Sequence, residues 1–183
     1  MNLVDIINNI FSILSILAQG ISVVLLISLF SRPLRDSAFV SFFAIHSILV
    51  GFVASALAMA GSLTYSDVVG YAPCVLCWFQ RIFMYPQVIL LGLALYRRDL
   101  SMRLYAIVLS SVGGALALWH YLGQLGFGTL PCSALGYSVS CAERFVMQYG
   151  YVTIPMMALS AFVLIALSSA VSLRKDRDNI IQN

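Results

Sequence analysis

The amino-acid sequence predicts an all-α integral membrane protein in which five helices cross the bilayer. Of its 183 residues, 61% are hydrophobic and only 9% are charged, and the mean hydropathy of +0.97 lies far outside the range of soluble globular domains. The apolar residues fall into five stretches, and each reaches the length of about 20 residues that a spanning helix needs. This composition leaves no room for a second soluble domain and gives no support to nucleic-acid binding.

The first apolar stretch, residues 6–30, is expected to be a retained helix rather than a cleaved secretory signal. Asp5 precedes it where a signal peptide would carry basic residues, and no small-residue cleavage site follows it. Asn8, Asn9 and Gln19 make this stretch more polar than the others. We therefore expect it to pack against the bundle rather than to face lipid on all sides.

Four further spans are expected at residues 38–60, 75–96, 104–122 and 151–173. His46 lies near the middle of the second of these five spans. A polar side chain at that depth is expected to donate a hydrogen bond to another helix.

The basic residues predict how the bundle is oriented. Eight of the ten follow the first, third or fifth span, and such ends should face the cytoplasm. The N-terminus is then outside and the C-terminus inside. Loops 61–72 and 123–150 face the outer compartment, where disulfides persist. The eight residues are Arg32, Arg35, Arg97, Arg98, Arg103, Arg174, Lys175 and Arg177.

All four cysteines lie in these outer loops or at the edge of the membrane. Cys74 and Cys77 form a C-x-x-C pair, and thiols three positions apart on a helix share one face, so they can bridge. Pro73 is expected at the first helical position, which would place both cysteines in the first turn. There the helix dipole favours the reactive thiolate form. A structural clamp or two packed thiols is the alternative reading.

Two further polar residues are expected at the depth of the C-x-x-C pair. Arg81 follows Cys77 by four positions on the same helical face and is a candidate to stabilise a thiolate or a reduced cofactor. Snorkelling to the lipid headgroups is its alternative. His120, at the outer end of the fourth span, is a candidate for a proton or hydrogen-bond role, or for a purely local hydrogen bond.

Cys132 and Cys141 lie in the second outer loop with eight residues between them, among glycines and serines. A structural disulfide is one reading of this pair. Its predicted proximity to the C-x-x-C pair allows another, in which two disulfides exchange through a mixed disulfide. Four cysteines could also bind one zinc ion or an iron–sulfur centre.

These motifs resemble the DsbB/BdbC-type disulfide bond formation proteins of bacterial membranes. The resemblance rests on Pro-Cys-Val-Leu-Cys-Trp-Phe-Gln-Arg at 73–81, on Met-Tyr-Pro at 84–86, and on Ser-Cys-Ala-Glu-Arg at 140–144. The C-x-x-C precedes the loop pair, whereas the related vitamin K epoxide reductase family has the reverse order. The resemblance covers residues 38–173 as a four-helix domain. Residues 1–37 are then an added helix with a cytoplasmic loop, and residues 174–183 a cytoplasmic tail.

The resemblance implies an enzyme of the bacterial cytoplasmic membrane, a protein-disulfide:quinone oxidoreductase. A reduced thioredoxin-fold, DsbA-like partner would attack Cys132 and release Cys141. Cys141 would then attack Cys74, leaving Cys77 to pass electrons to the membrane quinone, either ubiquinone or menaquinone. No metal is implied.

The resemblance also implies that Arg81 and His120 lie near the quinone ring. The chain departs from the family pattern in its added first helix, in the short gap between the loop cysteines, and at Gln80, where some relatives carry a glutamate.

Two other functions are compatible with the residues alone. One is a membrane thiol reductase or electron conduit, which would need a thiol donor on the inner side, where no cysteine is expected. The other is a non-catalytic membrane protein that binds a metal through its four cysteines.

Overall fold

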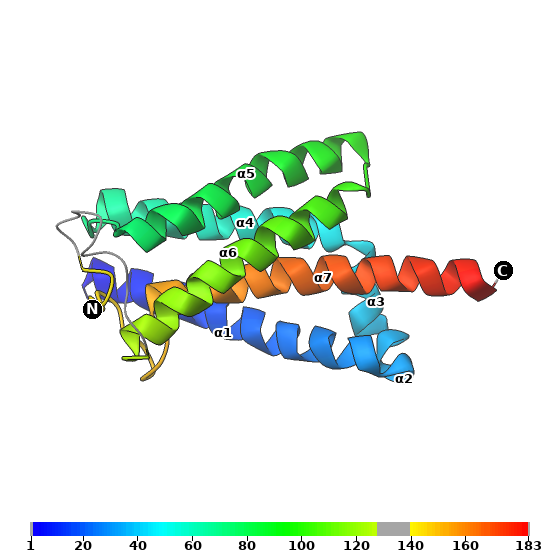
Figure 1. Ribbon diagram of the computed structural model, residues 1–183, viewed down its shortest axis with the longest axis horizontal. Helices are drawn as coiled ribbons and strands as arrows, with labels where there is room; N and C mark the ends of the chain where they lie inside the picture. Colours follow the sequence, from blue (N-terminus) through cyan, green and yellow to red (C-terminus); the bar gives the residue numbers. More distant parts are fainter. Residues whose placement is uncertain (1, 128–139, 183) are drawn as a thin grey trace.

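The computed structural model describes residues 2–127 and 140–182, and over this part of the chain the protein is an all-α bundle, as the sequence predicts (Figure 1). Five helical segments are long and apolar enough to cross a membrane, in agreement with the expected number. The elements are α1 (Leu3–Phe30), α2 (Arg32–Arg35), α3 (Ala38–Ile45), α4 (Ser47–Leu63), the π-helix η1 (Thr64–Val68), α5 (Val75–Arg97), α6 (Met102–Gln124) and α7 (Ile154–Gln182).

Helix α7 is the central element of the bundle. It packs against α1, α4 and α6, whereas α5 packs mainly against α4 and α6. Figure 1 shows α7 running along the middle of the molecule, with the N-terminus at one end and the C-terminus at the other. Phe162 and Ile165 of α7 are fully buried and pack with Ile48, Met84 and Leu91 from the neighbouring helices.

The second span differs from the prediction, because residues 38–60 do not form one helix. The backbone leaves the helical conformation at His46 (φ −97°, ψ 22°), so that α3 ends there and the spanning segment is Ser47–Val68. His46 Nδ1 donates to the carbonyl of Phe42 at 3.0 Å, within its own segment. The prediction that His46 donates a hydrogen bond to another helix is therefore wrong. Hydropathy is continuous across the break, which is why the sequence did not reveal it.

Helix α1 packs on α7 through small polar residues, as its composition predicts. Ser15 Oγ lies 2.9 Å from Ser160 Oγ, and Gln19 Nε2 donates to the same Ser160 oxygen at 3.0 Å. Tyr151 in turn donates its hydroxyl to Gln19 Oε1 at 3.0 Å. Small side chains allow two helices to approach closely, and their hydrogen bonds join α1 to the bundle where lipid offers no polar partner.

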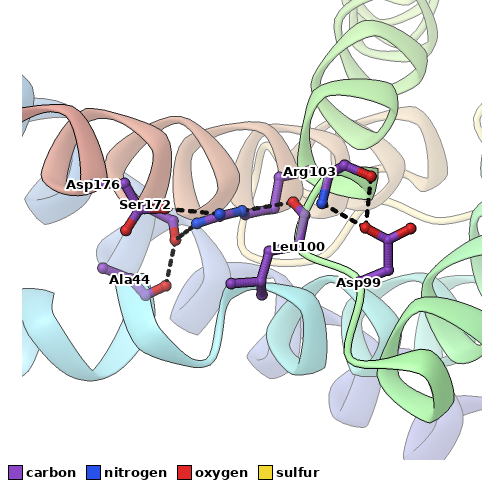
Figure 2. Close-up of polar contacts among 7 residues, drawn as sticks. Ala44, Asp99, Leu100, Arg103, Ser172 and Asp176 are labelled. Carbon is purple, nitrogen blue, oxygen red and sulfur yellow. Dashed lines mark hydrogen bonds and ion pairs between the residues drawn. The ribbon is translucent and has the colours of Figure 1, made fainter. Parts of the chain in front are cut away.

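A polar network joins three helices at the end of the bundle away from the cysteines (Figure 2). The buried Arg103 of α6 donates to Ser172 Oγ at 2.5 Å and pairs with Asp176 at 2.7 Å, and Ser172 donates to the carbonyl of Ala44 at 2.6 Å. Residues 174–182 continue α7 as a helix, so that Asp178 also reaches Arg35, at 3.1 Å. Two of the basic residues that predicted the orientation, Arg35 and Arg103, are thus paired with acidic partners.

Gly113 lets α6 approach the buried ring of Phe162 closely. A Cβ at Gly113 would lie 2.4 Å from ring atoms of Phe162, whereas a Cβ at Gly114 would have its nearest atom at 3.5 Å. We expect Gly113→Ala to lower the free energy of unfolding by about 1–3 kcal/mol through overpacking, and Gly114→Ala to leave it within about 0.5 kcal/mol. Thermal unfolding of both variants in the same detergent measures this difference, and equal midpoints would contradict the packing.

Candidate functional site

The C-x-x-C pair lies at the start of α5, which begins two residues later than the sequence predicted. Pro73 was expected at the first helical position, but α5 begins at Val75 and Cys74 is its N-cap, with extended backbone (φ −75°, ψ 172°). The carbonyl of Cys74 accepts the first helical hydrogen bond, from Trp78 N at 3.2 Å. Proline also suits the extended segment that leads into a helix, which explains the difference. Only Cys77 lies in the first turn.

Cys74 and Cys77 are free thiols in this structure, and their Sγ atoms lie 3.2 Å apart. Cys74 is buried, with 4% of its surface exposed, and Cys77 is partly buried. A small approach of the two sulfurs would close a disulfide. The arrangement is that of a dithiol that can be oxidised and reduced without moving the helix.

His120 of α6 connects Cys74 to the segment that carries Cys141. The imidazole is buried, and its Nε2 lies 3.0 Å from the carbonyl oxygen of Cys141 and 3.8 Å from Cys74 Sγ. Its Nδ1 lies 3.0 Å from Gln80 Nε2. An amide nitrogen only donates, so Nδ1 accepts and the ring proton is on Nε2, directed toward Cys141 and Cys74.

Gln80 is therefore a site residue to which the sequence assigned no role. It is buried on α5, three positions after Cys77, and it fixes the tautomer of His120. A polar side chain one turn beyond the C-x-x-C pair in a mostly apolar helix was the available signal. Its partner could be known only once α5 and α6 were placed side by side.

The surroundings of Cys74 favour its thiolate. The hydrogen bond from the Cys77 thiol, followed by the hydrogen bond and electrostatic interaction with His120, holds the pKa of the Cys74 thiol well below its usual value, although burial acts in the opposite direction. A lowered thiol pKa is thus found at Cys74, and its causes are the Cys77 thiol and His120 rather than the helix dipole that the sequence suggested.

Cys141 lies against the C-x-x-C pair. It is disulfide-bonded, only 1% exposed, and packs in one cluster with Cys74, Val75 and Leu76. Its expected partner Cys132 lies outside the described residues. The structure therefore brings three of the four predicted redox cysteines to one end of the bundle, with His120 beside two of them.

Arg81 is partly buried and hydrogen-bonded to α4. Its Nε donates to Ser62 Oγ at 2.9 Å and its Nη2 to the Ser62 carbonyl at 3.1 Å, and Tyr85 donates to the same Ser62 hydroxyl at 3.1 Å. The guanidinium also lies over the Trp78 ring, 5.1 Å from its centroid. These contacts tie the partly buried Arg81 to α4 and to the Trp78 ring of its own helix.

Two cavities meet at the thiol pair. The larger, of about 500 Å³, is mostly apolar and has Cys77, Gln80, Arg81 and Ser62 at one end. The smaller, of about 50 Å³, is lined by Cys74, Cys77, Arg81, His120 and Cys141, among others. Among the described residues His120 lines only the smaller cavity, whereas Arg81 and Cys77 line both.

Within the described part of the chain, only two of the four cysteines considered as metal ligands from the sequence lie in a group that could bind a metal, and His120 joins them there. The ligand atoms of Cys74, Cys77 and His120 lie within 4.8 Å of one another, and two thiolates with an imidazole suit zinc. Cys141 is in a disulfide and offers no thiolate. The four-cysteine metal site considered from the sequence is therefore not the arrangement found.

Comparisons with known proteins give one consistent result. The family model "Disulfide bond formation protein DsbB" matches residues 44–172. The chain is 36% identical over 129 residues to the "Probable disulfide formation protein C" of Bacillus cereus, covering 70% of this chain and 93% of that relative. It is 37% identical over 123 residues to the "Disulfide bond formation protein C" of Bacillus subtilis, covering 66% and 87%. No solved structure matches the chain.

Proposed function

The chain belongs to the DsbB family of disulfide bond formation proteins, which makes it a membrane oxidoreductase, and on that basis we propose that it is a protein-disulfide:quinone oxidoreductase. It reoxidises a thioredoxin-fold, DsbA-like thiol oxidase and passes the electrons to ubiquinone or menaquinone. One observation carries this proposal: Cys74 is packed against Cys141 beside His120, while its neighbour Cys77 lines the large apolar cavity.

Two disulfide exchanges account for the electron transfer within the chain. When a partner thiolate has opened the Cys132–Cys141 disulfide, the Cys141 thiolate attacks Cys74 Sγ, the Cys74–Cys77 bond breaks, and Cys77 leaves as a thiolate. Cys132, released from the now oxidised partner, then attacks Cys141 and frees Cys74. The result is a Cys74/Cys77 dithiol beside a disulfide-bonded Cys141, which is the redox state of the present structure.

His120 is assigned to this exchange rather than to the quinone. Its Nε2 proton lies within reach of Cys74 Sγ and of the Cys141 backbone. It can therefore stabilise negative charge on the Cys74 sulfur when the Cys74–Cys141 bond of the mixed disulfide breaks. The resemblance had placed His120 near the quinone ring. Its absence from the described lining of the large cavity favours the thiol role.

The large cavity fits a quinone. Its walls are mostly apolar, and its polar end gathers Cys77 with Arg81, Ser62 and Tyr85, which could hold and orient a ring carbonyl. A quinone bound there would accept two electrons and two protons. Arg81 supplies the only fixed positive charge among the described lining residues, next to the sulfur from which the electrons leave.

We further propose that the thiol end of the bundle faces outward, with the N-terminus outside and the C-terminus in the cytoplasm. Helix directions support this orientation: the basic residues that follow α1, and those in or just after the last turns of α5 and in the C-terminal part of α7, lie at the end opposite to Cys74. The added first helix moves the N-terminus to the outer side of the membrane, while the four-helix domain keeps its orientation.

Purified protein supplied with a reduced thioredoxin-fold oxidase and a quinone tests the function. We expect one quinone to be reduced for each disulfide formed in the partner. The loss of quinone absorbance and the loss of partner thiols measure the two reactions. Partner oxidation without quinone reduction would contradict the proposal.

Replacing Arg81 should slow the quinone step selectively. We expect Arg81→Met to lower the rate of quinone reduction about 10²-fold, because a fixed charge next to the reacting atoms is lost. Disulfide exchange with the partner, measured without quinone, should continue. Arg97→Met makes the same change at the exposed, opposite end of α5 and serves as the control. Equal quinone reduction by both variants would remove Arg81 from the site.

A further inference from the structure

Helix α1 forms a wall of the large cavity although it lies outside the family match. The match begins at residue 44, and α1 ends at Phe30. An alignment of 129 residues covers 93% of the relative from Bacillus cereus, and the part of that relative left unaligned is too short for a further helix of 28 residues. Yet one face of α1 lines the cavity, with Phe11, Leu14, Ser15, Leu17, Ala18 and Ile21.

The cavity is an elongated slot along the bundle. On α4 the lining residues extend from Leu49 to Ser62, so the slot is roughly 20 Å long at about 1.5 Å per helical residue. Its floor is α7, from Ile154 to Leu164, and Arg81 marks its polar end. A space of this length is longer than a quinone ring and leaves room for an extended tail.

Phe11 closes the slot at the thiol end. A Cβ at Gly61 would lie 2.8 Å from the Phe11 ring, so only glycine allows this approach of α1 to α4. The Phe11 ring also lies 5.8 Å from that of Tyr65. This contact is next to Ser62, which holds Arg81, so α1 covers the end of the slot where the charged side chain lies.

The slot opens sideways toward the bilayer. Leu17 of α1 and Leu49 and Val53 of α4 both line it and are exposed on the surface of the bundle, with 58%, 43% and 44% of their surface accessible. Residues with both properties form a rim. The rim is apolar, as an entrance from the hydrocarbon core must be.

We propose that α1 turns the quinone site of this chain into a walled slot for the isoprenoid tail, entered from the bilayer between α1 and α4. This inference rests on the proposed function. The slot is continuous with the Cys77 thiol, which suits a redox-active occupant, and Arg81 already directs two of its donor groups to Ser62, which leaves a poor site for a lipid phosphate.

A matched pair of tryptophan variants on α1 tests the wall. Ala18→Trp fills the slot, because Ala18 lines it. Gly20→Trp adds the same side chain two residues further on, where no atom lies within 4 Å of a Cβ. Quinone that copurifies with each protein is extracted and quantified, and isothermal titration gives the affinity for ubiquinones with one and with four isoprene units.

We expect the wild-type protein and Gly20→Trp to bind the four-unit quinone at least about tenfold more tightly than the one-unit quinone, and Ala18→Trp to lose most of this preference and of its copurified quinone. Leu17→Trp, at the exposed rim, needs no repacking and should show the same loss more weakly. If Ala18→Trp and Leu17→Trp both keep the wild-type preference for the four-unit quinone, the role of α1 is overturned. The role of α1 is also overturned if the wild-type protein copurifies with phospholipid in place of quinone and binds the one-unit and four-unit quinones with equal affinity. If the wild-type protein binds neither ubiquinone and copurifies with neither ubiquinone nor menaquinone, the proposed function itself fails.

Discussion

Cys77→Ser is expected to abolish quinone-dependent disulfide formation, with a loss of at least about 10³-fold in turnover. Cys77 is the member of the pair that lines the large cavity, and its Sγ lies 3.2 Å from that of Cys74. A serine hydroxyl can neither form the disulfide that receives electrons from Cys141 nor leave as a thiolate. Turnover is measured as quinone absorbance in the presence of reduced partner.

Cys132→Ser provides the matched comparison for this loss. Both variants stop turnover, but Cys77→Ser keeps the disulfide that the partner attacks, so it should still oxidise up to one equivalent of partner in a single burst. Cys132→Ser should show no burst. Steady turnover by Cys77→Ser, or a burst from Cys132→Ser, would contradict the order of electron transfer that we propose.

His120→Ala is expected to shift the titration of the Cys74 thiolate toward higher pH. A lowered pKa means that Cys74 stays a thiolate at pH values where an ordinary cysteine is protonated, and that the thiolate disappears only when the pH falls through this lowered pKa. Without the imidazole the thiol regains its proton at a higher pH. Disulfide exchange at neutral pH should then fall by about 10²-fold.

Thiolate absorbance near 240 nm, followed against pH in the reduced protein, measures this shift without requiring access of a reagent to the buried sulfur. His46→Ala changes the other histidine of the chain, whose imidazole hydrogen-bonds to the Phe42 carbonyl in its own segment, and should leave the titration unchanged. Gln80→Leu removes only the donor to Nδ1 and should give a smaller shift in the same direction. A titration of His120→Ala that overlays the wild type would exclude His120 as the stabilising group.

Much of the fold and of the site could be predicted because the membrane imposes simple rules on the sequence. Five long apolar stretches gave five spans, and the polar residues of the first stretch indicated that it packs on the bundle. The helical spacing of Cys74, Cys77 and Arg81 placed these residues at one end of α5. The break at His46 and the N-cap position of Cys74 were not predicted, since both depend on single backbone angles that hydropathy does not record.

The sequence by itself determined that this is a helical membrane protein and predicted a redox-active cysteine pair, because span length, charge and cysteine spacing are local properties of the chain. Only the tertiary structure decided which groups surround each sulfur: His120, oriented by Gln80, at Cys74, and the slot walled by α1 at Cys77. These contacts join residues from different helices. They depend on how α1, α4, α5, α6 and α7 pack, and packing is set by side chains such as Gly61 and Gly113 whose neighbours are unknown until the helices are placed together.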